Sequence, residues 1–210
     1  TPQNALSYHL KQLRALGLLR DRRSSQDARD VYYSVDIERL DVLYQAVGRA
    51  LHPALMPAED GDAHRARAGR PLRMLFLCTH NSARSQLAEG IARYVGGEAV
   101  EAYSAGSEPA DVHPLALAKL AELGIDTSTL RSKSLEEFRG RQFDYVITVC
   151  DRVRDACPTF FDDPHQIHWS FADPAALEDE QAQRRAFETT CRELTTRLRY
   201  LLASSSARRP

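Results

Sequence analysis

The sequence predicts an α/β protein with a small parallel sheet of four strands flanked by helices, preceded by a short α+β segment. Apolar runs typical of strands buried on both faces alternate with helical stretches over residues 72–204. Residues 52–71 are rich in Ala, Pro, Gly, Asp and Arg and lack periodicity, as linkers do. Residues 1–51 show a helix, two strands and a helix. We therefore expect domains at 1–51 and 72–204, a linker at 52–71 and a tail at 205–210.

Composition and charge exclude several classes of protein. The 210 residues suffice for one full domain and a smaller one, and the net charge of −1 provides no global attraction to nucleic acid or membrane. No apolar run approaches the roughly 20 residues of a membrane span, and no signal peptide is recognised. Four cysteines do not suggest a disulfide framework, so a cytoplasmic location and no membrane partner are expected. Because the chain starts at Thr1, inside a motif, we expect it to be part of a longer protein.

The first segment is expected to form a helix, a hairpin and a second helix. Residues 3–19 carry three leucines at i, i+4 and i+7 on an inward face: Leu6, Leu10 and Leu13. Gly17 ends this helix. The runs Leu18–Arg22 and Val31–Val35 read as strands. Asp36–Leu51 reads as a helix with an apolar face made of Leu40, Leu43 and Val47.

This order resembles the recognition helix, wing and final helix of ArsR-type winged-helix repressors. Over residues 1–35, six Lys and Arg oppose three Asp and Glu, and the resulting charge of +3 suits a phosphate backbone. The resemblance implies operator DNA as a partner in a full-length parent, contacted by Gln3, Asn4, Ser7, Tyr8, Lys11 and Arg23. It also implies a homodimer formed through this segment. The alternative interpretation is an amphipathic helix with a solvated outer face.

The stretch from Met74 to Gly90 carries the clearest chemical signal. Met74–Leu77 reads as a buried strand, and Ser82–Val95 has the spacing of a helix. The loop between them starts at Cys78 and has Arg84 six positions on. A loop that enters a helix N-terminus presents backbone N–H groups to an oxyanion. The same field favours a thiolate at Cys78 at neutral pH, and Arg84 can clamp the anion with two N–H groups.

The spacing Cys-x5-Arg-Ser between a strand and a helix resembles the low-molecular-weight protein tyrosine phosphatase family. The longer string Cys-Thr-x-Asn-Ser-x-Arg-Ser-Gln-x-Ala-Glu-Gly is similar to the arsenate reductase branch of that family. The resemblance implies that the loop binds arsenate through Thr79, His80, Asn81, Ser82, Ala83, Arg84 and Ser85. His80 and Ala83 stand where relatives often have Gly and Cys, and neither position is expected to supply an essential group.

The remaining elements alternate as a parallel sheet requires. Further strands are expected at Ala99–Ala105, Tyr145–Cys150 and Ile167–Phe171, with helices at Pro114–Leu123 and Ala176–Leu202. Ligands of such sheets bind at the carboxyl ends of the strands. Cys78 and Cys150 both lie at strand ends, so we expect them to converge. Cys191 falls on the apolar face of the last helix and is expected to be a packing thiol.

A second pair of cysteines, Cys150 and Cys157, distinguishes a reductase from a phosphatase. Reducing arsenate needs two electrons, which a dithiol can supply without a bound cofactor. The resemblance implies a relay in which Cys78 attacks arsenate, Cys150 attacks the adduct, and Cys157 then displaces Cys78. Thioredoxin is the expected external reductant, with glutathione or mycothiol as alternatives. If residues 151–157 are helical, the two Cα atoms lie roughly 10 Å apart. A disulfide tolerates about 7 Å, so this helix must unwind.

An acid and a cation complete the predicted site. Asp173, before Pro174, is expected to protonate the departing oxygen. The phosphatases usually have aromatic residues after this Asp-Pro pair, whereas this chain has Ala175-Ala176, which favours a small inorganic anion. Some related reductases bind potassium through an Asn, a Glu, a Ser and an Asp. Asn81, Glu89 and Ser104 match the first three, and Lys133 stands in the place of the fourth. We expect its ammonium group to replace the cation, and no metal site.

Two other functions remain open. The first is a low-molecular-weight phosphatase that acts on phosphate esters, because the anion loop alone suffices for that reaction. The second is a non-enzymatic repressor whose phosphatase-like domain senses an oxyanion.

Overall fold

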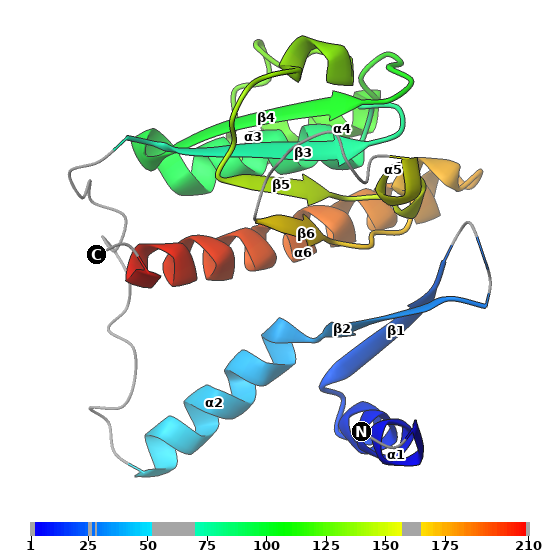
Figure 1. Ribbon diagram of the computed structural model, residues 1–210, viewed down its shortest axis with the longest axis vertical. Helices are drawn as coiled ribbons and strands as arrows, with labels where there is room; N and C mark the ends of the chain where they lie inside the picture. Colours follow the sequence, from blue (N-terminus) through cyan, green and yellow to red (C-terminus); the bar gives the residue numbers. More distant parts are fainter. Residues whose placement is uncertain (1–2, 25–26, 28, 52–69, 157–164, 209–210) are drawn as a thin grey trace. The chain divides into compact units, whose positions relative to one another are not determined.

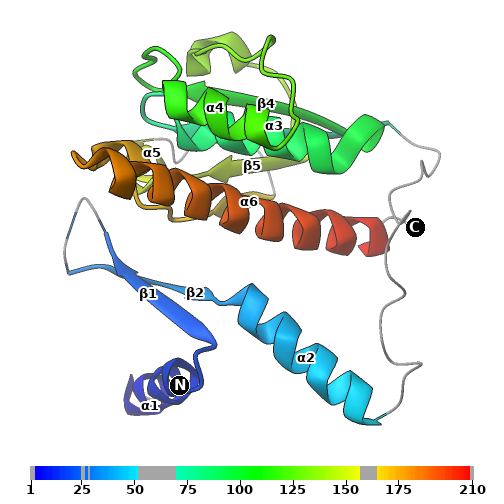
Figure 2. The same ribbon diagram turned by 180° about the vertical axis from the view of Figure 1, so that it is seen from behind.

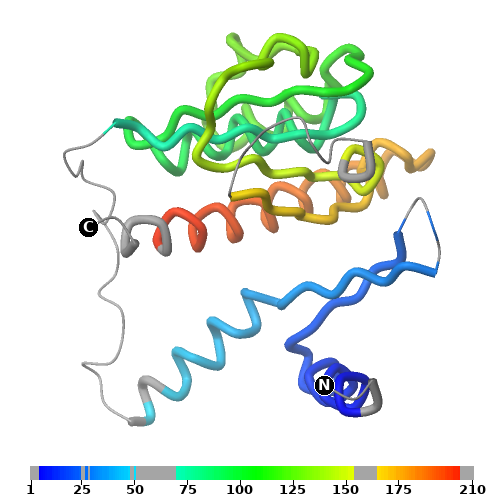
Figure 3. The backbone as a smooth tube through the Cα atoms, in the orientation of Figure 1, coloured from blue at the N-terminus to red at the C-terminus, as the bar shows by residue number. Residues whose placement is uncertain are grey.

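The computed structural model describes most of the chain, and the ranges it covers are residues 3–24, 27, 29–51, 70–156 and 165–208 (Figure 1). Figure 3 traces the same backbone as a tube. The chain divides into two compact units, Thr1–Ala63 and His64–Pro210. Residues 52–69 of the expected linker and Cys157 of the expected relay lie outside the described residues.

The first unit contains the elements expected, in the order expected: α1 (Gln3–Ala15), β1 (Leu19–Arg23), β2 (Val31–Val35) and α2 (Ile37–Leu51). The two strands pair antiparallel, with Leu19 opposite Val35 and Arg23 opposite Val31. The assignment of this unit to the winged-helix repressors and its contact with DNA stay predictions.

The first unit buries little of its apolar surface. On α1, Leu6 is 55% and Leu13 38% exposed, and on α2, Leu40 and Val47 are 47% and 57% exposed. The expectation that the leucine stripe of α1 points into a core is therefore wrong for Leu6 and Leu13. A helix, a hairpin and a second helix offer too few elements to enclose both apolar faces.

The second unit is the predicted α/β structure (Figure 1). Its longer elements are β3 (Leu72–Cys78), α3 (Arg84–Gly96), β4 (Val100–Gly106), α4 (Pro114–Glu122), β5 (Tyr145–Thr148), α5 (Asp151–Ala156), β6 (Gln166–His168) and α6 (Glu180–Arg208). The four strands are parallel in the order β4-β3-β5-β6, which confirms the predicted sheet. In this register Cys78 lies opposite Gly106 of β4, and Leu77 lies opposite Thr148 of β5.

Both faces of the sheet are covered by apolar side chains. Figure 2 shows α3, α4 and α6 gathered on one side, where Leu87, Leu120 and Phe187 have no exposed surface. Side chains alternate along a strand, so Tyr103 of β4 points to the side opposite its neighbour Ser104, which contacts α3 through Glu89. There the Tyr103 ring meets those of Phe138 and Phe143, with centroids 5.7 and 5.9 Å away.

Several predicted boundaries differ from the observed ones. β5 ends at Thr148 and β6 at His168, because the last hydrogen bonds of these strands to their neighbours are those of Val149 N and Trp169 N. The last helix starts at Glu180 rather than Ala176, since Pro174–Ala176 forms a separate 3-10 turn. It continues to Arg208, beyond the expected domain end at residue 204. Among the described helices, none combines the length and apolar character needed to cross a bilayer.

Candidate active site

The loop between β3 and α3 turns its N–H groups inward. Three of its carbonyl oxygens accept backbone N–H groups from residues 108–113 at 2.9–3.0 Å: those of Thr79, His80 and Ser82. In a trans peptide the N–H lies opposite the carbonyl, so the N–H groups that follow these carbonyls face the inside of the loop. One of them, on Asn81, donates to Cys78 Sγ at 3.1 Å. The loop therefore presents N–H donors at the N-terminus of α3, an arrangement that suits a tetrahedral oxyanion.

Gly106, the last residue of β4, lets this loop lie close to the sheet. A Cβ atom at this position would lie 2.6 Å from the carbonyl oxygen of Thr79 and 2.8 Å from the backbone nitrogen of Asn81. Backbone atoms cannot yield as a flexible side chain does, so any side chain here would distort the loop.

Asn81 holds the loop from the inside. Its φ of 47° is the only positive φ of a non-glycine residue among the described ones, in a region where Asn is tolerated better than most residues. The side-chain oxygen accepts Lys133 N at 2.7 Å and Gln86 Nε2 at 3.0 Å. Its Nδ2 donates to Ser85 Oγ and Ser104 Oγ, both at 2.8 Å. All of these atoms are buried, so the network fixes one conformation of the loop.

Cys78 lies at the bottom of the loop and is 2% exposed. Burial raises the pKa of the Cys78 thiol, while the hydrogen bond with Ser85 Oγ at 2.9 Å and the charge of Arg84 lower this pKa in part. The net shift of this pKa is thus opposite in direction to the one that a position at a helix N-terminus predicts. Loss of water around the sulfur outweighs the donors that would stabilise its charge.

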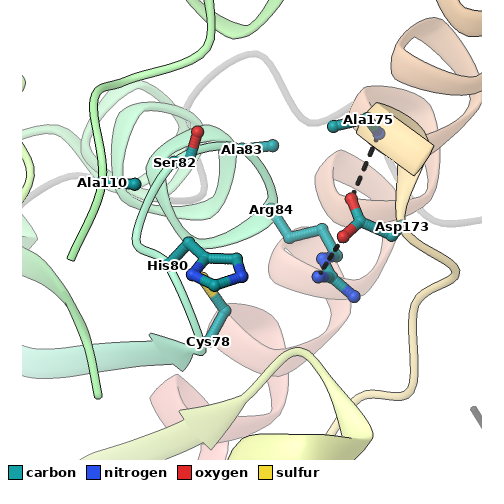
Figure 4. A pocket seen from close by; sticks show the side chains of 8 residues that line it. All are labelled: Cys78, His80, Ser82, Ala83, Arg84, Ala110, Asp173 and Ala175. Carbon is teal, nitrogen blue, oxygen red and sulfur yellow. Dashed lines mark hydrogen bonds and ion pairs between the residues drawn. The ribbon is translucent and has the colours of Figure 1, made fainter. Parts of the chain in front are cut away.

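A pocket of about 120 Å³ opens above the sulfur (Figure 4). It is lined by Cys78, His80, Ser82, Ala83, Arg84, Ala110, Asp173 and Ala175. Across it, Arg84 Nη2 contacts Asp173 Oδ2 at 2.8 Å, and Arg84 Nη1 donates to the carbonyl oxygen of Phe171 at 3.2 Å. The predicted clamp and the predicted acid thus lie in one pocket and pair with each other. Arg84 Nε has no partner among the described residues, so the guanidinium group keeps a donor for an entering oxyanion beside its contact with Asp173.

Cys150 lies beside the loop, as the strand order predicted. Val149 N donates to Leu77 O at 2.8 Å, which places the start of the α5 segment next to the end of β3. Thr79 Oγ1 lies 3.4 Å from Cys150 Sγ. The charge of Cys150 also raises the pKa of Cys78, by electrostatic repulsion. Asp151, buried at the start of α5, accepts a hydrogen bond from Ser170 Oγ at 2.8 Å and lies 3.3 Å from His168 Nε2.

Lys133 joins a buried cluster behind the loop. Its Nζ lies 2.9 Å from Glu89 Oε2 and 2.9 Å from the carbonyl oxygen of Arg131. Glu89 is 1% exposed and also pairs with Arg93 and accepts the hydroxyl of Ser104. A buried carboxylate needs such compensation. Within the described residues, no group of three or more His, Cys, Asp or Glu is arranged to hold a metal ion.

Sequence reasoning missed two members of this site. Gln86 donates to the carbonyl oxygen and the side chain of Asn81 and to Arg131 O, and Arg93 pairs with Glu89. The available signals were the place of Gln86 in the motif quoted above and the spacing of Arg93 one helical turn after Glu89. The contact of Gln86 with Arg131, 45 residues away, could not be read from the sequence. Cys191 is buried at 6% exposure, as a packing thiol should be.

The residues predicted to contact DNA belong to the first unit. Ser7, Tyr8 and Lys11 are exposed on α1, and Arg23 is exposed at the end of β1. Gln3 and Asn4 lie in the first turn of α1, and their side chains are outside the described part of the structure.

Comparison with known proteins finds relatives of the second unit. A family model described as low molecular weight phosphotyrosine protein phosphatase matches residues 73–209. Over 111 residues the chain is 38% identical to the arsenate reductase of Halalkalibacterium halodurans. The aligned region covers 53% of this chain and 80% of that protein. A solved arsenate reductase in the phosphate-binding state aligns with a TM-score of 0.55 at 31% identity, over 63% of this chain and 98% of that one. For the thioredoxin-dependent arsenate reductase of Corynebacterium glutamicum the TM-score is 0.55 and the identity 33%, over 68% and 66% of the two chains.

The raised pKa of Cys78 predicts how fast iodoacetamide alkylates it in the absence of oxyanions. The neutral thiol predominates at pH 7, and the rate should rise with pH through and beyond the ordinary thiol value of about 8.5. Ser85→Ala removes a contact that lowers this pKa, so the inflection should move to higher pH. Peptide mapping separates Cys78 from Cys191, a buried control whose pKa is raised to about 11. A wild-type inflection below 8.5, or none of the expected shift in Ser85→Ala, would contradict the assignment.

Proposed function

The chain belongs to the low molecular weight phosphotyrosine protein phosphatase family, together with its arsenate reductases, and we propose that it reduces arsenate to arsenite by a cysteine relay. The observation that best supports the proposal is the position of Cys150 next to the oxyanion loop that contains Cys78, with Thr79 Oγ1 3.4 Å from the Cys150 sulfur. A phosphatase has no need of a second thiol there.

In the first step, arsenate enters the loop and is bound by Arg84, whose Nε has no partner among the described residues. The Cys78 proton passes to an oxygen of the arsenate dianion as the sulfur bonds to arsenic. One arsenic–oxygen bond breaks, and the oxygen leaves as water after it takes a proton from Asp173. Asp173 acquires that proton from solvent beforehand and is left as a carboxylate beside Arg84.

In the second step, the thiolate of Cys150 attacks the sulfur of Cys78. The sulfur–sulfur bond forms as the sulfur–arsenic bond breaks, and its electron pair stays with arsenic. Arsenic(V) becomes arsenic(III), which leaves as arsenite. The sulfurs lose the two electrons that arsenic gains.

In the third step, the Cys157 thiolate attacks Cys150 and displaces Cys78 as a thiolate. An external thiol, here thioredoxin, then reduces the Cys150–Cys157 disulfide. The helix α5 (Asp151–Ala156) lies between the two cysteines along the chain. We propose that it unwinds in this step, because a helix continued through both cysteines would hold their Cα atoms farther apart than a disulfide allows.

In this proposal the ammonium group of Lys133 replaces a bound potassium ion. Its ammonium group contacts the buried carboxylate of Glu89, and the side-chain oxygen of Asn81 is already bonded to two N–H groups. A potassium ion therefore does not fit beside these oxygens. The fixed positive charge and the loop are connected through Glu89, Ser104 and Asn81.

An NADPH-linked assay with thioredoxin and thioredoxin reductase tests the relay. Wild-type protein should consume NADPH continuously with arsenate. Cys157→Ser should form about one arsenite per molecule and stop, because its Cys78–Cys150 disulfide is not passed on, and Cys150→Ser should form none. Cys191→Ala, which changes a thiol outside the site, should match the wild type.

The same variants separate the alternatives. Turnover by Cys157→Ser at the wild-type rate would refute the relay. Aryl phosphate hydrolysis that survives in Cys150→Ser, while arsenate reduction is lost, would show that both activities share Cys78. No turnover by the wild type with thioredoxin present, together with anion-dependent DNA binding, would favour the non-enzymatic repressor.

Thermal melting in potassium chloride against choline chloride tests the role of Lys133. The wild type should melt at the same temperature in both salts. Lys133→Asp should be destabilised in choline and regain stability in potassium, because the cation restores the missing charge. Lys133→Met, which offers neither charge nor ligand, should lose about 3 kcal/mol and show no response to potassium. A wild-type melting temperature that depends on potassium would refute the substitution.

We infer for residues 1–51 a DNA-binding role, supported by the helix–hairpin–helix order, the charge of +3 over residues 1–35 and the exposed Lys11 and Arg23. Fluorescence anisotropy with a labelled duplex should show binding that weakens with salt. Lys11→Ala and Arg23→Ala should each lower the salt slope by about 1, whereas Arg199→Ala in the second unit should not. Equal binding by all four proteins would exclude this surface.

A further inference from the structure

His80 stands at the mouth of the oxyanion pocket and is held there by three contacts. Its Nδ1 lies 3.1 Å from the carbonyl oxygen of Glu108. Its own carbonyl oxygen accepts Ala110 N at 2.9 Å and Ser132 Oγ at 3.4 Å. Ring and backbone are thus both tied to neighbouring segments, although the residue itself is exposed.

These contacts determine which ring nitrogen faces the pocket. A carbonyl oxygen can only accept, so Nδ1 carries the hydrogen and Nε2 is left for another partner. Figure 4 shows one ring nitrogen on the side of Arg84 and Asp173, above Cys78. Neutral Nε2 accepts a hydrogen bond from a hydroxyl group, and a protonated ring donates one to an oxyanion. Both partners are present on a free hydrogen arsenate ion.

The size of the pocket limits what else can occupy it. Its volume is about 120 Å³, less than the roughly 150 Å³ of a protein cavity that holds benzene. An aryl group attached to a bound phosphate must therefore extend outward past the more exposed lining residues, which include His80, Ala110, Asp173 and Ala175. Of these, His80 is the only ring.

We propose that His80 determines specificity for free oxyanions over phosphate esters. Its ring bonds the anion oxygen that points away from Cys78 and stands in the path of an ester's organic group. In a phosphate ester this oxygen carries the organic group, so the hydrogen bond to His80 is lost and the organic group clashes with the ring. This role rests on the proposed arsenate reductase function and extends it to the choice of substrate.

Two substitutions separate the effect of the His80 hydrogen bond from the steric effect of its ring. His80→Ala removes both, so the arsenate KM should rise about tenfold, as expected for one hydrogen bond, and kcat/KM for p-nitrophenyl phosphate should rise by a similar factor. His80→Phe keeps the bulk alone, so its arsenate KM should rise as much while ester hydrolysis stays at the wild-type level. In both variants kcat for arsenate should change less than twofold.

A binding measurement keeps this test independent of arsenate reduction. Protection of Cys78 from iodoacetamide reports the affinity for inorganic phosphate and for p-nitrophenyl phosphate in each variant, and circular dichroism confirms that each is folded. His80→Ala should reduce the preference for inorganic phosphate. If the wild type fails to reduce arsenate but this preference changes as expected, the proposed function fails and the role of His80 stands. An unchanged preference in His80→Ala, or an equal loss of arsenate kcat in both variants, would overturn it.

Discussion

The buried side chain of Asn81 is the contact on which the rest of the site depends. Its amide group joins the loop to the helix at Ser85 and Gln86, to β4 at Ser104 and to the segment that contains Lys133. A buried amide that lost any of these partners would leave a polar group unsatisfied, at a cost of about 1–3 kcal/mol. These hydrogen bonds therefore hold the loop with its N–H groups directed inward.

The same network connects charge to reactivity. Lys133 and Arg93 neutralise Glu89, Glu89 accepts the hydroxyl of Ser104, and Asn81 bonds both Ser104 and Ser85. Ser85 Oγ accepts this amide hydrogen and lies 2.9 Å from Cys78 Sγ. A chain of hydrogen bonds thus connects a remote positive charge to the sulfur. Burial nevertheless outweighs these contacts and raises the pKa of the Cys78 thiol on balance.

The convergence of the two thiols follows from a simple property of parallel sheets. Strands that run in the same direction bring their carboxyl ends to one edge, and β3 and β5 are neighbours there. This much was predictable from two apolar runs that each end in a cysteine. The presence and order of α1 and α2 were predictable as well, but the exposure of their apolar faces was not. Periodicity shows which residues share a face and cannot show whether another element covers that face.

The sequence alone determined the order of elements, the parallel sheet and the loop chemistry of Cys78 and Arg84, because these depend on periodicity and on spacing within a short stretch. It also singled out Lys133 by its place in a motif. Only the tertiary structure decided the partners of Asn81, the pairing of Arg84 with Asp173, the direction in which the pKa of Cys78 is shifted and the orientation of His80. Each of these depends on desolvation or on contacts between residues far apart in the chain, and a linear pattern carries no information on either.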